Sequence, residues 1–122
     1  MSITTKNFGR EGEDLAVDLL KSKGYEIIER NYTFGKGEID IIALDPETNY
    51  TVFVEVKSRK NLEYGEPEYG ITKNKIRQLK KMAVLYLYDK DIKELDCRFD
   101  VVTVLFRSKI KPLISHYLNA FD

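Results

Sequence analysis

Two neighbouring segments of the chain, residues 37–43 and 52–59, alternate between apolar positions and charged or polar positions. This alternation predicts β-strands, because successive side chains of a strand point to opposite faces. The two faces of the second segment are Val52, Val54 and Val56 on one side and Phe53, Glu55 and Lys57 on the other. Residues 45–49, which include Pro46, give a turn signal between the segments. The pattern predicts a hairpin that carries charges where a core strand should have none.

Apolar residues at helical spacing predict two helices. The first runs from Gly9 to about Gly24, with acids near its start and lysines near its end. Its apolar positions are Leu15, Ala16, Leu19 and Leu20. The second follows Thr72, a residue that can cap a helix, and ends near Asp89. Its apolar positions, at the three- and four-residue steps of one helix face, are Ile76, Leu79, Ala83, Tyr86 and Leu87.

Two further strands are predicted, one before the hairpin and one after the second helix. Residues 25–32 form a mixed strand, and residues 97–106 are nearly continuous in Val, Thr, Leu and Phe, which indicates a central, buried strand. Residues 1–8 are interpreted as a polar arm and residues 60–70 as an exposed loop. The tail, residues 113–121, is too short for an assignment.

The predicted order is helix, strand, strand, strand, helix, strand, an α/β fold around a mixed central sheet. We expect residues 1–122 to form a single domain, because a chain of this length buries roughly two thirds of its unfolded surface. The longest apolar run, residues 101–106, is far too short to cross a membrane, and the first ten residues have no signal-peptide core. We therefore expect a cytoplasmic protein without membrane association.

The hairpin register brings two acids together. If the turn is centred between Glu47 and Thr48, paired residue numbers sum to 95, so Asp40 faces Glu55. The same register places Glu38 opposite Lys57. Two carboxylates at roughly 5 Å between β-carbons destabilise a ladder unless a cation neutralises them. The register therefore predicts a divalent metal ion between Asp40 and Glu55.

Asp40 followed by Glu55-Val56-Lys57 resembles the motif of the PD-(D/E)XK nuclease superfamily, with Ile39 where the name of the motif has Pro. A wider likeness covers most of the chain and resembles the YraN family of small bacterial proteins. The segments that carry it are Gly9 to Glu13, Arg30 to Tyr32, Gly37 to Asp40, Phe53 to Arg59 and Asn119 to Phe121. That family is similar to archaeal Holliday-junction resolvases. The resemblance implies a restriction-endonuclease-like core.

Phosphodiester hydrolysis requires an activated water and neutralisation of charge, and Mg²⁺ or Mn²⁺ on hard oxygen ligands can supply both. We expect Asp40, Glu55 and the backbone carbonyl of Val56 to hold the ion. Lys57 would polarise the water or stabilise the developing charge. The resolvase-like relatives place an acid at the position of Glu13, so that residue is a further catalytic and metal-ligand candidate, or simply a favourable acid in a first helical turn. Glu38 is secondary and would bind a second ion or pair with Lys57.

The charges of the chain balance, with twenty basic and twenty acidic residues, so local patches must carry any nucleic-acid binding. Basic residues flank the acidic pair, and five lie within nine residues of the second helix. Such a run is usually a solvated face, so we favour residues at the edge of the site or at helix starts. The predicted nucleic-acid contacts are Arg10, Lys36, Arg59 and Lys73.

Two functions follow from these residues. The first is a metal-dependent DNA endonuclease, with branched or flapped DNA as a candidate substrate. The alternative is a DNA-binding or scaffold module that retains the nuclease fold without useful catalysis. Assembly is a separate question, because resolvase-like relatives act as dimers. The apolar tail residues would cover a core edge or meet a second copy of the chain; they are Leu113, Ile114, Tyr117, Leu118 and Phe121.

Overall fold

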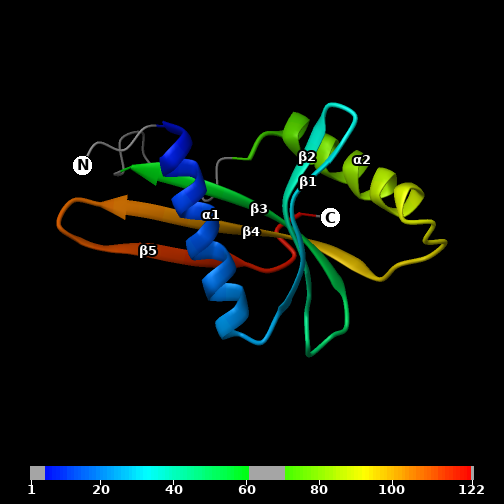
Figure 1. Cartoon of the computed structure of the whole chain (residues 1–122), viewed down its shortest axis with the longest axis horizontal. Helices are drawn as coiled ribbons and strands as arrows, with labels where there is room; N and C mark the ends of the chain where they lie inside the picture. The colour runs from blue at the N-terminus through cyan, green and yellow to red at the C-terminus, as the bar shows by residue number, and fades with distance from the viewer. Residues whose placement is uncertain (1–4, 61–70, 122) are drawn as a thin grey trace.

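The computed structural model describes residues 5–60 and 71–121, and within them the chain forms two helices and five strands (Figure 1). In chain order these are α1 (Thr5–Ser22), β1 (Glu26–Phe34), β2 (Gly37–Leu44), β3 (Thr51–Lys60), α2 (Lys73–Asp89), β4 (Cys97–Arg107) and β5 (Ile110–Tyr117). The predicted α/β order is confirmed, with one strand added at its end. Neither described helix is long and apolar enough to cross a membrane.

The five strands lie side by side in chain order, β1 to β5. β3 and β4 are parallel and the other neighbours are antiparallel, so the sheet is mixed, as predicted. The chain passes through α2 between β3 and β4, as a parallel connection requires. The predicted hairpin register is confirmed, because Ile41 faces Val54 and Leu44 faces Thr51.

Alternation along the strands gives the sheet two apolar faces, each covered by one helix. Val52 and Val54 of β3 pack with Ala16 and Leu20 of α1, whereas Phe53 packs with residues of α2. The buried residues of α2 are Leu79, Met82, Ala83 and Tyr86. Figure 1 shows α1 lying across β3, β4 and β5, with α2 beside the hairpin of β1 and β2. The result is a three-layer arrangement.

The helix starts can be compared with the prediction. α1 begins at Thr5, so the polar arm predicted for residues 1–8 is wrong from residue 5 onward; residues 1–4 lie outside the described part. Thr72 caps α2 as predicted, since its Oγ1 accepts the Lys75 N–H at 3.1 Å. Residues 61–70, most of the predicted exposed loop, also lie outside the described residues.

The unassigned tail forms β5 and a closing segment. Pro112 stands within β5, an edge strand among the described residues, where a missing N–H is tolerated. Beyond the strand, the Ala120 N–H donates to the Phe99 carbonyl at 2.8 Å, and the Phe121 ring stacks on the Phe99 ring with centroids 5.3 Å apart. The tail thus covers the end of β4. Leu118 remains half exposed.

Two glycines allow the helices to approach the sheet closely. A β-carbon at Gly12 of α1 would overlap the side chain of Ser58 on β3. One at Gly37 of β2 would overlap the side chain of Met82 on α2. These contacts fix α1 against β3 and α2 against the hairpin, on opposite faces of the sheet.

A buried polar cluster joins β4 to the turn before β3. Arg98 donates to Asp45 at 2.6 Å and to Asp100 at 2.9 Å. Burial opposes ionisation of Asp45, but the hydrogen bond from Arg98 brings the pKa of Asp45 down to about 2. Burial likewise opposes ionisation of Asp100, yet hydrogen bonds from His116 and Arg98 lower its pKa. The Arg98 guanidinium therefore stabilises two buried carboxylates at once.

His116 completes this cluster as a structural residue. The Lys23 Nζ lies 2.8 Å from its Nδ1, and Asp100 Oδ2 lies 2.8 Å from its Nε2. Because a lysine ammonium only donates, Nδ1 accepts and Nε2 carries the hydrogen that is donated to Asp100. The imidazole links the end of α1 to β4.

Replacing Arg98 tests this cluster. Arg98→Met should lower the free energy of unfolding by about 3 kcal/mol or more, because Asp45 and Asp100 are left buried without their counter-charge. Arg107→Met is the control: Arg107 is exposed and donates to the Lys111 carbonyl, so its loss should change stability by about 0.5 kcal/mol or less. Urea denaturation at pH 7 measures both.

The dependence of stability on pH below pH 4 gives a second test of the Arg98 cluster. A lowered pKa means that Asp45 stabilises the native state fully above pH 4 and loses that contribution as the pH falls toward 2. The stability difference between wild type and Arg98→Met should therefore shrink over that interval. A constant difference from pH 4 to pH 2 would contradict this assignment.

Candidate active site

The two predicted acids lie where β2 and β3 diverge. The ladder pairs Ile41 with Val54 and does not continue to Asp40 and Glu55. On the other side of β2, the pairing with β1 skips Asp40 and its opposite residue Asn31, whose φ of 52° is left-handed. The hairpin of β1 and β2 bends away from β3 beside α2 (Figure 1). The predicted register is correct, but the strands separate at the acids.

Asp40 replaces the missing ladder bond with its side chain. Its Oδ2 accepts the Val56 N–H at 2.8 Å. In an extended strand the N–H and C=O of one residue point to the same side, so the Val56 carbonyl also faces β2. This orientation suits the predicted role of that carbonyl as an additional oxygen ligand.

The two carboxyl groups share one environment. Burial, a hydrogen bond with Glu55 and the charge of Glu55 raise the pKa of Asp40 to about 8. Glu55 is itself buried, with 6% of its surface exposed. At neutral pH the protein without a bound cation therefore keeps a proton between the two groups. A divalent cation would replace that proton, because the pair then provides two hard oxygen donors.

Lys75 is the site residue that the sequence analysis did not assign. Its Nζ lies 3.3 Å from Glu55 Oε2, and its charge opposes the raised pKa of Asp40. The sequence does contain a signal. Thr72 caps α2, so Lys75 falls in the first turn, a turn without acids, where a cation opposes the helix dipole. A basic first turn suggests an anion nearby.

Glu38 and Lys57 lie around this pair. Partial burial raises the pKa of Glu38, the charges of Asp40 and Glu13 add to the shift, and Lys75 opposes it. Lys57 is half-buried and shares the Glu55 face of β3. The predicted ion pair between Glu38 and Lys57 does not form within the described residues.

Glu13 extends from α1 to the sheet, where two residues of β1 hold its carboxylate. Its Oε1 accepts from Arg30 Nε at 3.1 Å and from Asn31 Nδ2 at 3.0 Å. Asn31 is the residue opposite Asp40, so this bond joins α1 to the irregular point of the hairpin. Across residues 5–60 and 71–121, no three His, Cys, Asp or Glu side chains lie close enough to form a metal site. Asp40 and Glu55 are the two acids that lie together at this point of the sheet.

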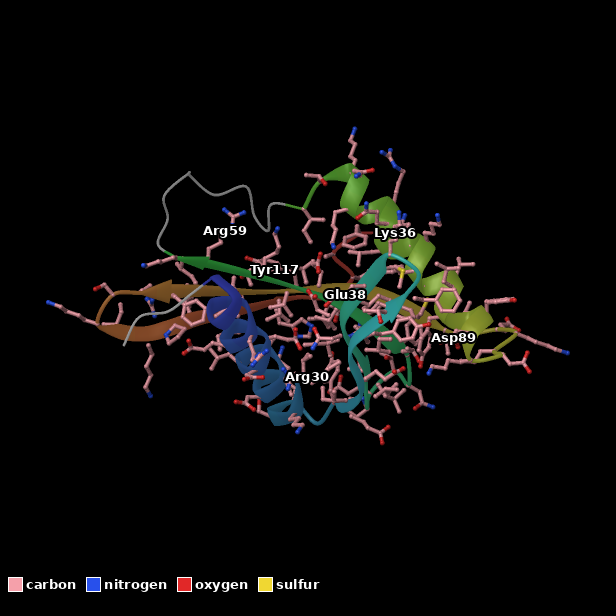
Figure 2. The ribbon with its side chains drawn as sticks, turned by 45° about the horizontal axis from the view of Figure 1, so that its top comes forward. Arg30, Lys36, Glu38, Arg59, Asp89 and Tyr117 are labelled. Carbon is pink, nitrogen blue, oxygen red and sulfur yellow. The ribbon has the colours of Figure 1, made fainter. Side chains whose placement is uncertain are left out.

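The predicted nucleic-acid contacts are spread over several elements. Arg10 lies exposed on α1, and Lys73 is exposed at the start of α2. Figure 2 shows Lys36 at the hairpin tip beside α2 and Arg59 on the far part of β3, with Glu38 between them in this view. The point where β2 and β3 diverge, which carries the acid pair, is called the fork below. The structure distributes these cations around the fork and brings none of them to the acid pair itself.

Two helices on a five-stranded mixed sheet, with paired acids where β2 and β3 diverge, define an α/β protein whose element order is consistent with a nuclease-like core. The chain belongs to the uncharacterised protein family UPF0102, whose family model matches residues 12–104. This confirms the resemblance to the YraN family.

Relatives in this family match almost the whole chain. A UPF0102 protein of Geobacter metallireducens is 42% identical over 122 residues, covering 100% of this chain and 98% of the relative. One from Natranaerobius thermophilus is 44% identical over 121 residues, with 98% and 100% covered. One from Persephonella marina is 45% identical over 114 residues, with 93% and 92% covered.

The proton held by Asp40 predicts a distinctive dependence of stability on pH. A raised pKa means that this group stabilises the native state below pH 4 and loses that contribution as the pH rises through about 8. Asn keeps an oxygen that can accept the Val56 N–H and has no charge to bury. In EDTA, the free energy of unfolding of Asp40→Asn should therefore increase relative to that of wild type between pH 4 and 8, until the variant is more stable by at least about 1 kcal/mol.

Asp45→Asn provides a control of opposite sign. The pKa of Asp45 is lowered, so removing its charge should destabilise the protein throughout that range. Urea titrations of the three proteins from pH 4 to pH 9 compare them. Equal pH dependence for wild type and Asp40→Asn would contradict a shared proton at Asp40.

Proposed function

We propose that this protein is a Mg²⁺- or Mn²⁺-dependent endonuclease that hydrolyses phosphodiester bonds in DNA, acting in the cytoplasm. The observation that carries the proposal is the acid pair. Asp40 and Glu55 are held together at a fork in the sheet, against the repulsion that their charges would create. A carboxyl group with a strongly shifted pKa beside a second acid, as Asp40 is, is typical of catalytic centres.

The residues divide the chemistry among them. Asp40, Glu55 and the Val56 carbonyl would hold the cation, which, when bound, lowers the pKa of water and neutralises phosphate charge. Lys57 lies on the same strand face as Glu55, in position to orient the attacking water or to stabilise charge on the phosphate oxygens. Lys75 would position Glu55 through its ion pair.

Glu13 and Glu38 have supporting roles in this proposal. Arg30 and Asn31 hold Glu13 at the edge of the fork, from which it would complete the ligand set through a bridging water. Glu38 shares the electrostatic environment of Asp40 and remains a secondary candidate, including for a second ion. Arg10, Lys36, Arg59 and Lys73 would contact phosphates without reading sequence, which suits branched or flapped DNA.

A binding or scaffold module is the second candidate function. The favouring observation is that Glu13 is bonded to Arg30 and Asn31 and no third acid joins Asp40 and Glu55 within the described residues. Such a module would bind DNA equally well after Asp40→Asn or Glu55→Gln. A homodimer is compatible with either function. The exposed apolar residues of β5 and the tail would then form the contact between the two copies.

Cleavage assays separate the two functions. Wild type, incubated with Mg²⁺ or Mn²⁺, should cut at least one of a linear, a flapped and a four-way DNA. Lys57→Ala and Glu55→Gln should lower the rate about a hundredfold or more, because each removes a group that meets the reacting phosphate or its cation. Lys60→Ala, exposed at the end of the same strand, should cut normally.

No cleavage of any substrate by wild type would refute the enzyme. Unchanged cleavage by Lys57→Ala would refute the assigned mechanism.

Metal binding should also stabilise the native state. A cation with a dissociation constant of about 1 mM adds roughly 1.4 kcal/mol at about 10 mM, which raises the melting temperature by several degrees. Asp40→Asn and Glu55→Gln should gain much less, because each loses a ligand charge. Thermal melts in EDTA, Mg²⁺ and Mn²⁺ test this, and an equal response from all three proteins would remove the metal site.

A further inference from the structure

A groove of about 700 Å³ lies between the hairpin of β1 and β2 and the helix α2. Its lining residues are Phe34, Gly35, Lys36, Gly37, Glu38, Lys75, Gln78, Lys81, Met82 and Leu85. Figure 2 shows Lys36 at the tip of this hairpin, beside α2, and Glu38 on the same hairpin. Lys75 lines the groove and pairs with Glu55, so this lysine connects the groove to the acid pair.

The charges of the groove come from both of its walls. Lys36 lies on the hairpin turn, and Lys75 and Lys81 lie on α2, whereas Glu38 is the one acid among the lining residues that the structure describes. Lys75 is engaged by Glu55. Within the described part of the chain, Lys36 and Lys81 form no ion pair with a carboxylate. Two lysines that face one groove from separate elements favour an anion lying along it.

Apart from Gln78 and two glycines, the other described residues of the lining are apolar. Phe34 is partly buried against the α2-side core, with its ring edge-on to the Tyr88 ring at 6.4 Å between centroids. Met82 and Leu85 belong to the same side of the core. A site with only phosphates to bind has no use for such a lining. Exposed bases, by contrast, stack on aromatic side chains and pack on apolar ones.

We infer that this groove binds an unpaired strand of nucleic acid, with phosphates at Lys36 and Lys81 and bases against Phe34 and Leu85. A duplex keeps its bases stacked inside and could use only the lysines. The inference rests on the proposed function, since the strand would continue from the groove to Asp40 and Glu55. It makes the substrate a DNA with a single-stranded segment at the cleavage point, such as a flap.

Binding without turnover tests the groove apart from the chemistry. In EDTA, fluorescence anisotropy would compare a labelled oligothymidine of about 15 nucleotides with a duplex of equal length. Wild type should prefer the oligothymidine. Lys36→Ala/Lys81→Ala should weaken oligothymidine binding about tenfold or more and reduce the salt dependence of log K by about 0.7 for each lysine.

Lys80→Ala is the matched control. Lys80 precedes Lys81 on the same helix and borders a different hollow, lined by Phe53, Ala83 and Leu95 among others. Its loss removes one positive charge, half of what the double variant removes, so affinity should change less than twofold if the groove is specific. Losses as large as those of the double variant would show diffuse electrostatic binding and overturn the inference.

Phe34→Leu tests the apolar part of the groove. Leu retains packing against the core but offers no ring, so oligothymidine binding should fall about fivefold or more, with duplex binding unchanged. Equal preference for duplex and oligothymidine, or unchanged binding in both variants, would refute the groove. Absence of cleavage in Mg²⁺ alongside groove-dependent binding would refute only the nuclease proposal, so the two failures are distinguishable.

Discussion

The repulsion between Asp40 and Glu55 is the constraint on which the site depends, and the fold maintains it by anchoring each acid elsewhere. β3 pairs with β4 along its whole length, from Thr51 to Lys60, so Glu55 cannot move away from the fork. The hairpin of β1 and β2, which carries Asp40, is fixed by the close contact of Gly37 with Met82 and by the hydrogen bond that joins Asn31 to Glu13. Neither strand can relax without losing core packing. The sheet therefore keeps two acids together, and this makes ionisation of both groups at once unfavourable.

Comparison with the Arg98 cluster shows how the same residue type serves two purposes. Asp45 and Asp100 are also buried, but Arg98 provides a permanent counter-charge, and their pKa values are lowered. Asp40 is half-buried next to another acid, and its pKa is raised. Each cluster has one cation for two carboxyl groups, Arg98 in the first and Lys75 in the second. In the first, both carboxylates accept hydrogen bonds from Arg98 and the fold is stabilised, whereas in the second the two acids face each other, and a proton or a ligand can satisfy them.

Local pattern was sufficient for most of the fold. Alternation in residues 52–59 gave β3 its two faces, and the turn at residues 45–49 gave the register that pairs Ile41 with Val54. The divergence of β2 and β3 could not be predicted from the turn, because a register deduced from residue numbers assumes that paired strands stay paired until one of them ends. The left-handed Asn31, opposite Asp40, belongs to the pairing of β1 with β2, which the register of β2 and β3 does not include. β5 was missed because Pro112 and polar residues obscure its alternation, and an edge strand depends on its neighbour β4 more than on its own sequence.

The first turn of α2 connects the acid pair to the groove, so that the two form one site. Lys73 and Lys75 stand at the positive end of the helix dipole, where each cation costs some tenths of a kcal/mol. Nothing in helix formation favours that placement, since the Thr72 cap works equally well before acids. Glu55 offsets the cost for Lys75. Lys36 and Lys81 add further positive charge across the adjoining groove, where Glu38 is the one acid among the described lining residues. A phosphate backbone passing from the groove to the fork would offset this excess, and the same chain of anions would end beside the two carboxyl groups that would hold the proposed cation.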